Sequence, residues 1–238
     1  MAGNIQILIT CEHGGNKIPK EYRYLFAGNE SVLETHRGYD PGALEMAKSV
    51  VKQLQCPFVY ETISRLLIEQ NRSYHHKEVF SEYSLKLSES QKSELIRQIY
   101  DSYHKKVDSY IATAIKMNKF VAHFSIHSFT PVLNGETRTA DIGFLYDPSR
   151  KAESEIVDSI KNQLLDTIHG IKIRKNYPYR GDSDGQTTTL RKRYSEKLYS
   201  GIEIEINQKH FFNRSEIWKN LKSYLPLYIG QTASEIKQ

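Results

Sequence analysis

The pattern of hydrophobic and polar positions along the chain alternates between two kinds of segment. Short, nearly continuous apolar runs predict buried strands over residues 5–10, 57–62, 65–69, 120–126, 141–146, 171–174 and 202–206. Apolar residues at helical spacing predict helices over residues 40–54, 91–117, 152–169 and 215–237. Strands that alternate with helices are typical of an α/β sandwich. We therefore expect an α/β fold with a mixed, largely parallel central sheet, formed as a single domain over residues 1–238.

Two long segments between the predicted elements show no clear periodicity. They cover residues 14–37 and 176–189. Long loops within compact domains are commonly functional. In the second segment Arg180 lies among aromatic residues and glycines, which is typical of a wall or lid over a site.

The composition is that of a folded protein, with 39% hydrophobic and 26% charged residues. No apolar run approaches the ~18 residues that a membrane span requires, so we expect no membrane partner. The first four residues show no basic and then apolar leader, so the expected location is the cytoplasm. The net charge of +5 comes from scattered basic residues without a nucleic-acid-binding motif, and it favours small anionic substrates over nucleic acid.

Cys11 and Cys56 are the only cysteines in the sequence, so the chain has no disulfide framework. Cys11 directly precedes Glu12 and His13, which raises the alternative of a thiol that acts as metal ligand or nucleophile. We favour the simpler interpretation, in which Cys11 is a small buried residue that closes the first strand.

Two histidines stand at the ends of predicted strands. His13 follows the strand over residues 5–10, and His127 follows the strand over residues 120–126. Open α/β sheets bind their ligands at the carboxyl ends of their strands, and imidazole nitrogens suit zinc. A catalytic zinc takes three protein ligands and leaves one position for water. The sequence therefore indicates a metal site that needs one more ligand.

Asp40 is the best placed residue for the third ligand. It opens the helix over residues 40–54, and the N-terminus of a helix tolerates negative charge. The alternative is that Asp40 only caps this helix before Pro41. Glu12 is the rival acidic ligand, although neighbours on an extended segment such as Glu12 and His13 tend to point to opposite sides.

The late strand over residues 202–206 alternates isoleucine with glutamate. With a period of two, Glu203 and Glu205 share one face of the strand. Burial of a carboxylate without a partner costs free energy, so the presence of two glutamates in so apolar a strand requires an explanation. One explanation is a metal-bound water molecule. The metal lowers the pKa of this water to ~7, and a neighbouring glutamate accepts its proton. The alternative is the solvated face of an edge strand.

The pair Asn71-Arg72 follows the strand predicted over residues 65–69. A guanidinium group holds a carboxylate in two parallel hydrogen bonds, which lysine cannot imitate. A single arginine is usually a surface charge, and Arg72 gains weight only from the residues around it. The remaining histidines that show no partner at a telling spacing are His36, His123, His169 and His210.

Several short pieces, in order over nearly the whole chain, carry a resemblance to a known family. They are Cys11–Gly15 with Ile18-Pro19, Tyr39–Ala43, Ser64-Arg65 with Asn71-Arg72, Ser125–Ser128, Asp141–Gly143, Tyr179–Gly181 and Glu203–Asn207. This combination resembles the N-formylglutamate amidohydrolase family. That family is similar to aspartoacylases and zinc carboxypeptidases, so the resemblance implies a three-layer sandwich of the zinc-carboxypeptidase type.

The resemblance implies a zinc site made of two histidines and one acid. In the related enzymes the acid closely follows the first histidine and opens a helix, but the matching position in this chain is Asn16. The corresponding helix begins instead at Asp40, behind an insertion. The resemblance therefore assigns the zinc ligands to His13, Asp40 and His127.

The resemblance also implies roles for residues around the metal. The late-strand glutamate that acts as general base falls on Glu205, and Glu203 is the less favoured choice. The Asn-Arg pair that contacts the substrate falls on Asn71 and Arg72. Before this pair the family pattern has Asp where this chain has Glu69, and we expect this change to matter little.

The implied function is that of a zinc-dependent amidohydrolase that cleaves the amide bond of a small anionic N-acyl amino acid. The reference reaction converts N-formyl-L-glutamate to formate and glutamate. Arg72 would stabilise the oxyanion or bind a substrate carboxylate with Asn71 orienting it, while Arg180 and Arg138 would hold a further carboxylate. Two alternatives stay open: a carboxypeptidase-like or other deacylase on the same scaffold, and a non-catalytic binding protein. The ligands would also accept other divalent ions, and the chain could form a homo-oligomer.

Overall fold

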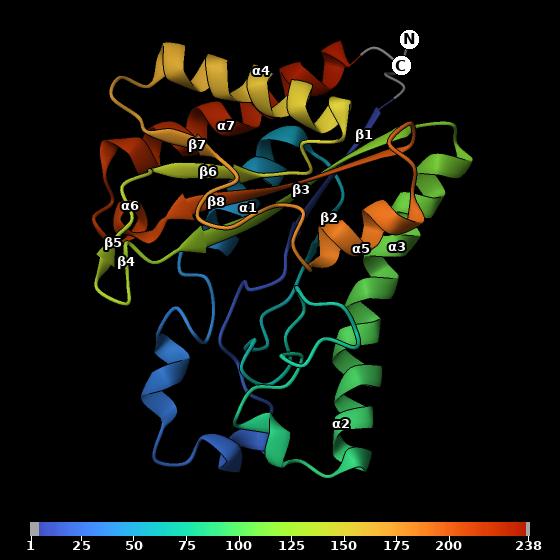
Figure 1. The fold of residues 1–238 in the computed structure, drawn as a ribbon, viewed down its shortest axis with the longest axis vertical. Coiled ribbons are helices and arrows are strands. Elements are labelled where there is room, and N and C mark those ends of the chain that lie inside the picture. Colours follow the sequence, from blue (N-terminus) through green and yellow to red (C-terminus); the bar gives the residue numbers. More distant parts are fainter. Residues whose placement is uncertain (1–4, 237–238) are drawn as a thin grey trace.

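A six-stranded sheet forms the centre of the computed structural model, which describes residues 5–236 (Figure 1). The strands are β1 (Ile5–Cys11), β2 (Phe58–Tyr60), β3 (Phe120–Phe129), β6 (Ile142–Leu145), β7 (Ile173–Lys175) and β8 (Tyr199–Asn207). Their order across the sheet is β2-β1-β3-β8-β6-β7. All neighbours pair in parallel except β6 and β8, which are antiparallel. The predicted mixed, largely parallel sheet is confirmed.

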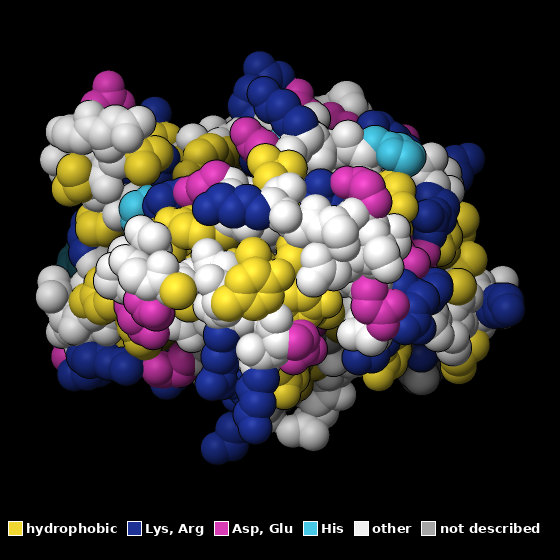
Figure 2. Space-filling model, turned by 90° about the horizontal axis from the view of Figure 1, so that it is seen from below, with side chains coloured by type: hydrophobic (Ala, Val, Ile, Leu, Met, Phe, Trp, Pro, Cys, Tyr) yellow, Lys and Arg dark blue, Asp and Glu magenta, His cyan; other side chains and the backbone are white. Residues whose placement is uncertain are grey.

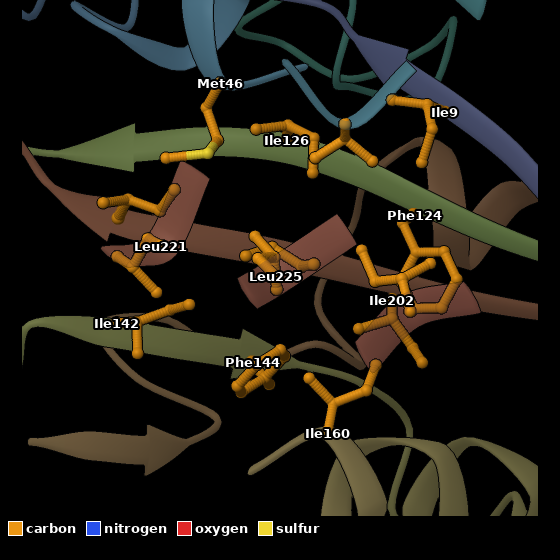
Figure 3. Close-up of a cluster of buried hydrophobic side chains, with 14 of the residues drawn as sticks. Ile9, Met46, Phe124, Ile126, Ile142, Phe144, Ile160, Ile202, Leu221 and Leu225 are labelled. Carbon is orange, nitrogen blue, oxygen red and sulfur yellow. The ribbon is translucent and has the colours of Figure 1, made fainter. Parts of the chain in front are cut away.

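Three helices cover one face of this sheet. They are α1 (Ala43–Leu54), α4 (Lys151–Thr167) and α7 (Glu216–Glu235). Their apolar side chains, such as Met46, Ile160 and Leu225, pack on strand residues such as Phe124 and Ile202 (Figure 3). Burial of this apolar surface is what holds the layer in place.

Two further helices, α3 (Asp101–Lys116) and α5 (Gln186–Arg193), cover the opposite face. Val107 of α3 and Leu190 of α5 pack there on Leu8 of β1 and Val121 of β3. Leu8 and Val121 alternate along their strands with residues that face the first helix layer, because successive side chains of a strand point to opposite faces. The α/β sandwich predicted from the sequence therefore has helices on both sides of its sheet.

A separate lobe lies below the sheet in Figure 1, where the chain leaves β1 and β2. It is built from η1 (Lys20–Phe26), η2 (Glu30–Glu34), η3 (Ser84–Lys86), α2 (Glu89–Leu95) and the π-helical turn η4 (Ile96–Tyr100). Phe26, Leu67, Ile68 and Leu95 form its core. The helical stretch predicted over residues 91–117 is thus real, and η4 joins α2 to α3 within it.

The prediction of a strand over residues 65–69 is wrong. These residues form turns in the lobe. Leu66, Leu67 and Ile68 are buried in the lobe's own core rather than in the sheet. An apolar run signals burial, but it does not say against which core the residues are buried.

Other elements differ from the prediction at their ends or were not predicted. The structure adds α6 (Gln208–Phe212) and a hairpin of β4 (Val132–Leu133) and β5 (Glu136–Thr137). The strand predicted over residues 171–174 lies one or two residues later, as β7, and the segment 176–189 ends inside α5. The predicted end of the last helix, Lys237, lies outside the described residues.

The surface of the lobe mixes charge types. Lys and Arg side chains lie there among acidic and apolar ones (Figure 2). This mixture agrees with the scattered basic residues of the sequence. Among residues 5–236 there is no helix with both the length and the apolar character needed to cross a membrane.

A buried ion pair ties α4 and α5 to the sheet. Arg191 Nε donates to Glu153 Oε1 at 2.9 Å, and the two terminal nitrogens of Arg191 donate to the carbonyl groups of Gly181 and Gly201, each at 2.6 Å. Glu153 Oε1 also accepts the backbone N–H of Gly201 at 3.0 Å. Because Gly181 belongs to the segment 176–189 and Gly201 to β8, this pair holds that segment on the sheet.

Replacing Arg191 with Met is expected to lower the free energy of unfolding by about 3–5 kcal/mol, because the buried carboxyl group of Glu153 would lose its partner. Chemical denaturation at neutral pH measures this loss. The matched control is Arg97→Met, which removes an exposed arginine paired with Glu94 and should leave the midpoint nearly unchanged. Equal midpoints for wild type and Arg191→Met would contradict the prediction.

Candidate active site

Polar side chains converge at the carboxyl edge of β1, β3 and β8. His13 follows β1, and His127 of β3 pairs in register with Glu205 of β8. Residues in register on neighbouring strands present their side chains on the same face, so His127 and Glu205 lie side by side. A cavity of about 470 Å³ opens here, and all three residues line it.

His13, Asp40 and His127 form a buried group in which one ligand atom from each residue lies within 4.8 Å of the others. Asp40 Oδ2 is 2.9 Å from His127 Nδ1 and 3.4 Å from His13 Nδ1. The centres of the two imidazole rings are 5.0 Å apart. Two imidazole nitrogens and one carboxylate oxygen form a donor set that suits zinc.

The side chain of Asp40 does not cap α1. The N-cap position of that helix is Gly42, whose φ of 85° is easily adopted by glycine. The carboxylate of Asp40 turns instead to the histidines and accepts the backbone N–H of Ser128 at 3.3 Å. The backbone N–H of Asp40 donates to the carbonyl of His13 at 2.9 Å, which fixes one residue against the other.

The charges of this group support one another. Burial opposes protonation of His127, but the hydrogen bonds and charges of Asp40 and Glu12 outweigh it and raise the pKa of His127 well above its usual value. Burial likewise opposes ionisation of Asp40, yet the neighbouring histidines hold the pKa of Asp40 far below its usual range. Asp40 is therefore an ionised carboxylate, as a metal ligand must be.

Glu69 and Arg65 support His13 from the lobe. Glu69 Oε1 accepts a hydrogen bond from His13 Nε2, and Glu69 Oε2 pairs with Arg65 at 2.6 Å. Arg65 also reaches Asp40 at 3.4 Å and lines the cavity. No role was predicted for Arg65 from the sequence, although its spacing of four residues to Glu69 could have indicated the pair.

Glu12, the rival acidic ligand, lies on the other side of His127. Glu12 Oε2 is 3.3 Å from His127 Nε2 and accepts the hydroxyl of Ser125 at 2.5 Å. Burial raises the pKa of Glu12, but the hydrogen bonds of His127 and Ser125 outweigh burial and hold it well below its usual range. Within the described part of the chain, the group whose ligand atoms converge contains Asp40 and not Glu12 or Cys11.

Glu205 and Glu203 lie in the interior of the sheet, because β8 runs between β3 and β6, so the edge-strand alternative is wrong. Glu203 Oε1 accepts the hydroxyl of Thr187 at 2.8 Å. Glu205 Oε2 is buried and finds no hydrogen-bond partner among residues 5–236. Burial raises the pKa of Glu205 to about 7, which suits a group that takes and returns a proton near neutral pH.

Asn71 and Arg72 both line the cavity on the side of the lobe. Asn71 Oδ1 accepts the backbone N–H of Gln186 at 2.7 Å, at the start of α5. Arg72 donates to the carbonyl of Asp184 at 2.8 Å and leaves about one third of its side chain, 33%, exposed to the cavity and solvent. Both residues thus join the lobe to the segment 176–189.

Arg180 and Arg138 occupy different positions around the cavity. Arg180 lines it, pairs with Asp182 at 2.6 Å and is largely exposed. The residues that line the cavity within the described range do not include Arg138. Arg138 instead lies 5.2 Å from the ring centre of Tyr179, which does line it, and donates to the hydroxyl of Tyr179 at 3.3 Å.

Both loops that the sequence marked as functional contribute to the cavity wall. The segment 14–37 supplies His36 and Arg37, and the segment 176–189 supplies Tyr179, Arg180, Ser183 and Asp184. His36 had no signal in the sequence, because its neighbours in the cavity come from other parts of the chain.

The family model of N-formylglutamate amidohydrolase matches residues 5–212. This chain belongs to the N-formylglutamate amidohydrolase family. It is thus a hydrolase that acts on a linear amide, and the family resemblance stated from the sequence is confirmed. No curated protein matches the chain.

Two solved structures share the fold over almost their full length. The gene product Atu2144 from Agrobacterium tumefaciens has a TM-score of 0.81 and 27% identity, with 100% of this chain and 93% of that chain covered. The N-formylglutamate amidohydrolase from Ralstonia eutropha JMP134 has a TM-score of 0.71 and 18% identity, with coverage of 95% and 92%. The fold of this chain is therefore shared with both of these structures.

Replacing Asp40 with Asn is expected to lower the pKa of His127 in the metal-free protein, because Asp40 supplies the strongest of the interactions that favour its protonated form. NMR signals of the histidine rings, followed against pH, measure the change. His104 is the internal control, since burial lowers its pKa and it contacts neither Asp40 nor His127. An unaltered His127 titration would contradict the electrostatic account.

Proposed function

We propose that this amidohydrolase uses zinc to cleave the amide bond of N-acyl amino acids such as N-formyl-L-glutamate, with formate and glutamate as products. One observation carries the proposal: a buried group of two histidines and one aspartate adjoins a buried carboxylate oxygen, that of Glu205, without a hydrogen-bond partner in the described structure. We place the whole activity in one domain.

The candidate ligands and the groups that hydrogen-bond to them both fit a zinc ion. Nδ1 of His13 and Nδ1 of His127 both face Asp40, so these three residues would hold the ion. The far nitrogen of each ring is anchored, in His13 by Glu69 and in His127 by Ser125. Such partners orient metal-binding imidazoles. Zinc supplies Lewis-acid polarisation of the amide carbonyl and makes a water molecule more acidic.

Glu205 is the proposed general base. Glu205 lines the cavity beside His127, and its oxygen Oε2 has no hydrogen-bond partner among the described residues. Its pKa of about 7 lets it accept the proton of the attacking water and return that proton to the leaving amine. Glu203 is less suited to this task, because its carboxylate already accepts the hydroxyl of Thr187.

The proposed contacts with the substrate come from the arginines around the cavity. Arg72 stabilises the developing oxyanion or binds the substrate carboxylate, and Asn71 orients it. Arg180 binds a further carboxylate from the segment 176–189. Arg138 contributes through Tyr179, against whose ring it packs.

The purified protein is expected to contain about one zinc ion per chain and to release formate from N-formyl-L-glutamate. Glu205→Gln should keep the zinc and lose a factor of about 10²–10⁴ in kcat, because it removes proton transfer but no ligand. His127→Ala should lose both zinc and turnover. Elemental analysis and formate release measure these two properties separately.

Two outcomes would contradict this proposal. Undiminished turnover by Glu205→Gln would remove Glu205 as the base, and absence of zinc from the active wild-type protein would remove the metal. A panel of short peptides tests the substrate class, because cleavage of peptides in preference to N-acyl amino acids would favour a carboxypeptidase-like activity.

Replacing Arg72 with Lys is expected to lower kcat/KM by a factor of about 10²–10³, because lysine cannot reproduce the guanidinium fork. Loss in kcat would assign Arg72 to the oxyanion, whereas a rise in KM would assign it to the substrate carboxylate. Steady-state kinetics with N-formyl-L-glutamate separate the two, with Arg97→Lys on the exposed surface as control. Unchanged kinetics would exclude Arg72 from both roles.

A further inference from the structure

A row of hydrogen-bonded polar side chains runs through the buried face of the sheet that α3 and α5 cover. It begins at Tyr199 of β8 and ends at His127 near the cavity. Its members, in order of contact, are Tyr199, His123, Thr10, Glu12, Ser125 and His127. Each of them is at most 2% exposed. Such a network is costly unless every member is satisfied, so the direction of each hydrogen bond can be worked out from its neighbours.

Glu12 receives hydrogen bonds on both of its oxygens. The hydroxyl of Thr10 donates to Oε1 at 2.9 Å, and the hydroxyl of Ser125 donates to Oε2 at 2.5 Å. An ionised carboxylate can only accept hydrogen bonds, so the hydroxyl groups of Thr10 and Ser125 both donate their hydrogen to Glu12. Whatever else contacts these two hydroxyl oxygens must therefore be a donor.

His127 Nε2 lies 2.8 Å from the hydroxyl oxygen of Ser125. Because the proton of Ser125 points to Glu12, Nε2 of His127 must carry a hydrogen and donate it to Ser125. Nδ1, which faces Asp40 at 2.9 Å, is then the nitrogen that can release its hydrogen and bind a metal.

The directions of the hydrogen bonds on the Thr10 side of Glu12 follow in the same way. His123 Nε2 lies 2.8 Å from the hydroxyl oxygen of Thr10, whose proton also points to Glu12, so this nitrogen donates. His123 Nδ1 is then an acceptor, and it receives the hydroxyl proton of Tyr199 at 2.7 Å. All hydrogen bonds of the row thus point toward one acceptor, the carboxylate of Glu12.

We propose that Glu12 is a positioning residue that keeps the hydrogen of His127 on Nε2 and so selects Nδ1 as the metal-binding atom, with Thr10 and His123 acting through Glu12. This inference rests on the proposed metal site. It replaces the interpretation of Glu12 as a rival ligand, because Glu12 contacts the imidazole at the nitrogen remote from Asp40. If Ser125 lost its acceptor, its hydroxyl could donate to Nε2, and the hydrogen on Nδ1 would block the lone pair.

The first test compares zinc affinity of metal-free wild type and Glu12→Gln by competition with a chromophoric chelator. In glutamine one of the two carboxylate oxygens is replaced by an NH2 group, which only donates, so one of the two hydroxyl groups would lose its acceptor. Zinc binding should weaken by a factor of about 10–100, the usual cost of removing an outer-shell partner. Ser200→Ala is the matched control, since it removes a buried hydroxyl of β8 that has no partner among the described residues.

Two variants of Thr10 separate positioning from packing. Thr10→Ser keeps the hydroxyl and loses a methyl group, whereas Thr10→Val keeps the volume and loses the hydroxyl. The proposal expects weaker zinc binding in Thr10→Val than in Thr10→Ser, and a role in packing alone expects the opposite order. Circular dichroism of each metal-free variant checks that the comparison is made on folded protein.

The atom bound to zinc can be read directly from ¹⁵N NMR of the histidine rings in the zinc-loaded wild type. A hydrogen on Nε2 of His127, with zinc on Nδ1, supports the proposal, and the reverse arrangement overturns it. Equal zinc affinity of wild type and Glu12→Gln would also overturn it while leaving the metal site intact. A wild type that binds no zinc would instead overturn the proposed function, and the inference with it.

Discussion

The parallel register of β3 with β8 is the constraint on which the site depends. It places His127 opposite Glu205 and Ser125 opposite Glu203, so the candidate ligand and the candidate base come from adjacent strands at the same height. A slip by one residue would turn each of these side chains to the other face of the sheet. The isoleucines of β8 that pack on the first helix layer resist that slip, because it would expose Ile202, Ile204 and Ile206 to the polar side.

Buried charge at this edge is tolerated because almost every charged group has a partner. Asp40 lies between two histidines, Glu69 between His13 and Arg65, and Glu12 accepts two hydroxyl groups. Glu205 lacks such donors, and burial raises its pKa for that reason. Under the proposed function, a cation held by Asp40 would favour the ionised form of Glu205 at the place where a proton must be taken up.

Residues at this edge of the sheet could be predicted from the sequence where a local pattern marked them. The ends of apolar strands indicated His13 and His127, and the start of a helix indicated Asp40. The alternation within β8 indicated Glu203 and Glu205 together, and only the family resemblance favoured Glu205. Arg65 and His123 escaped prediction, since their partners lie in other segments and no periodicity marks such contacts. The strand predicted over residues 65–69 failed for a related reason, because the apolar run packs in the lobe and not in the sheet.

The three candidate ligands are far apart in the chain: Asp40 comes 27 positions after His13, and His127 comes 87 positions after Asp40. An unfolded chain does not hold them together, so a metal that binds all three binds the folded state. A ligand present at a hundred times its Kd adds about 2.7 kcal/mol to the stability of a state that alone binds it. Under the proposed function, zinc would therefore stabilise the joint between the sheet and the segment before α1 that carries Asp40. The row of hydrogen bonds that ends on Glu12 would contribute by keeping the hydrogen of His127 on Nε2, so that Nδ1 is the nitrogen that binds the ion.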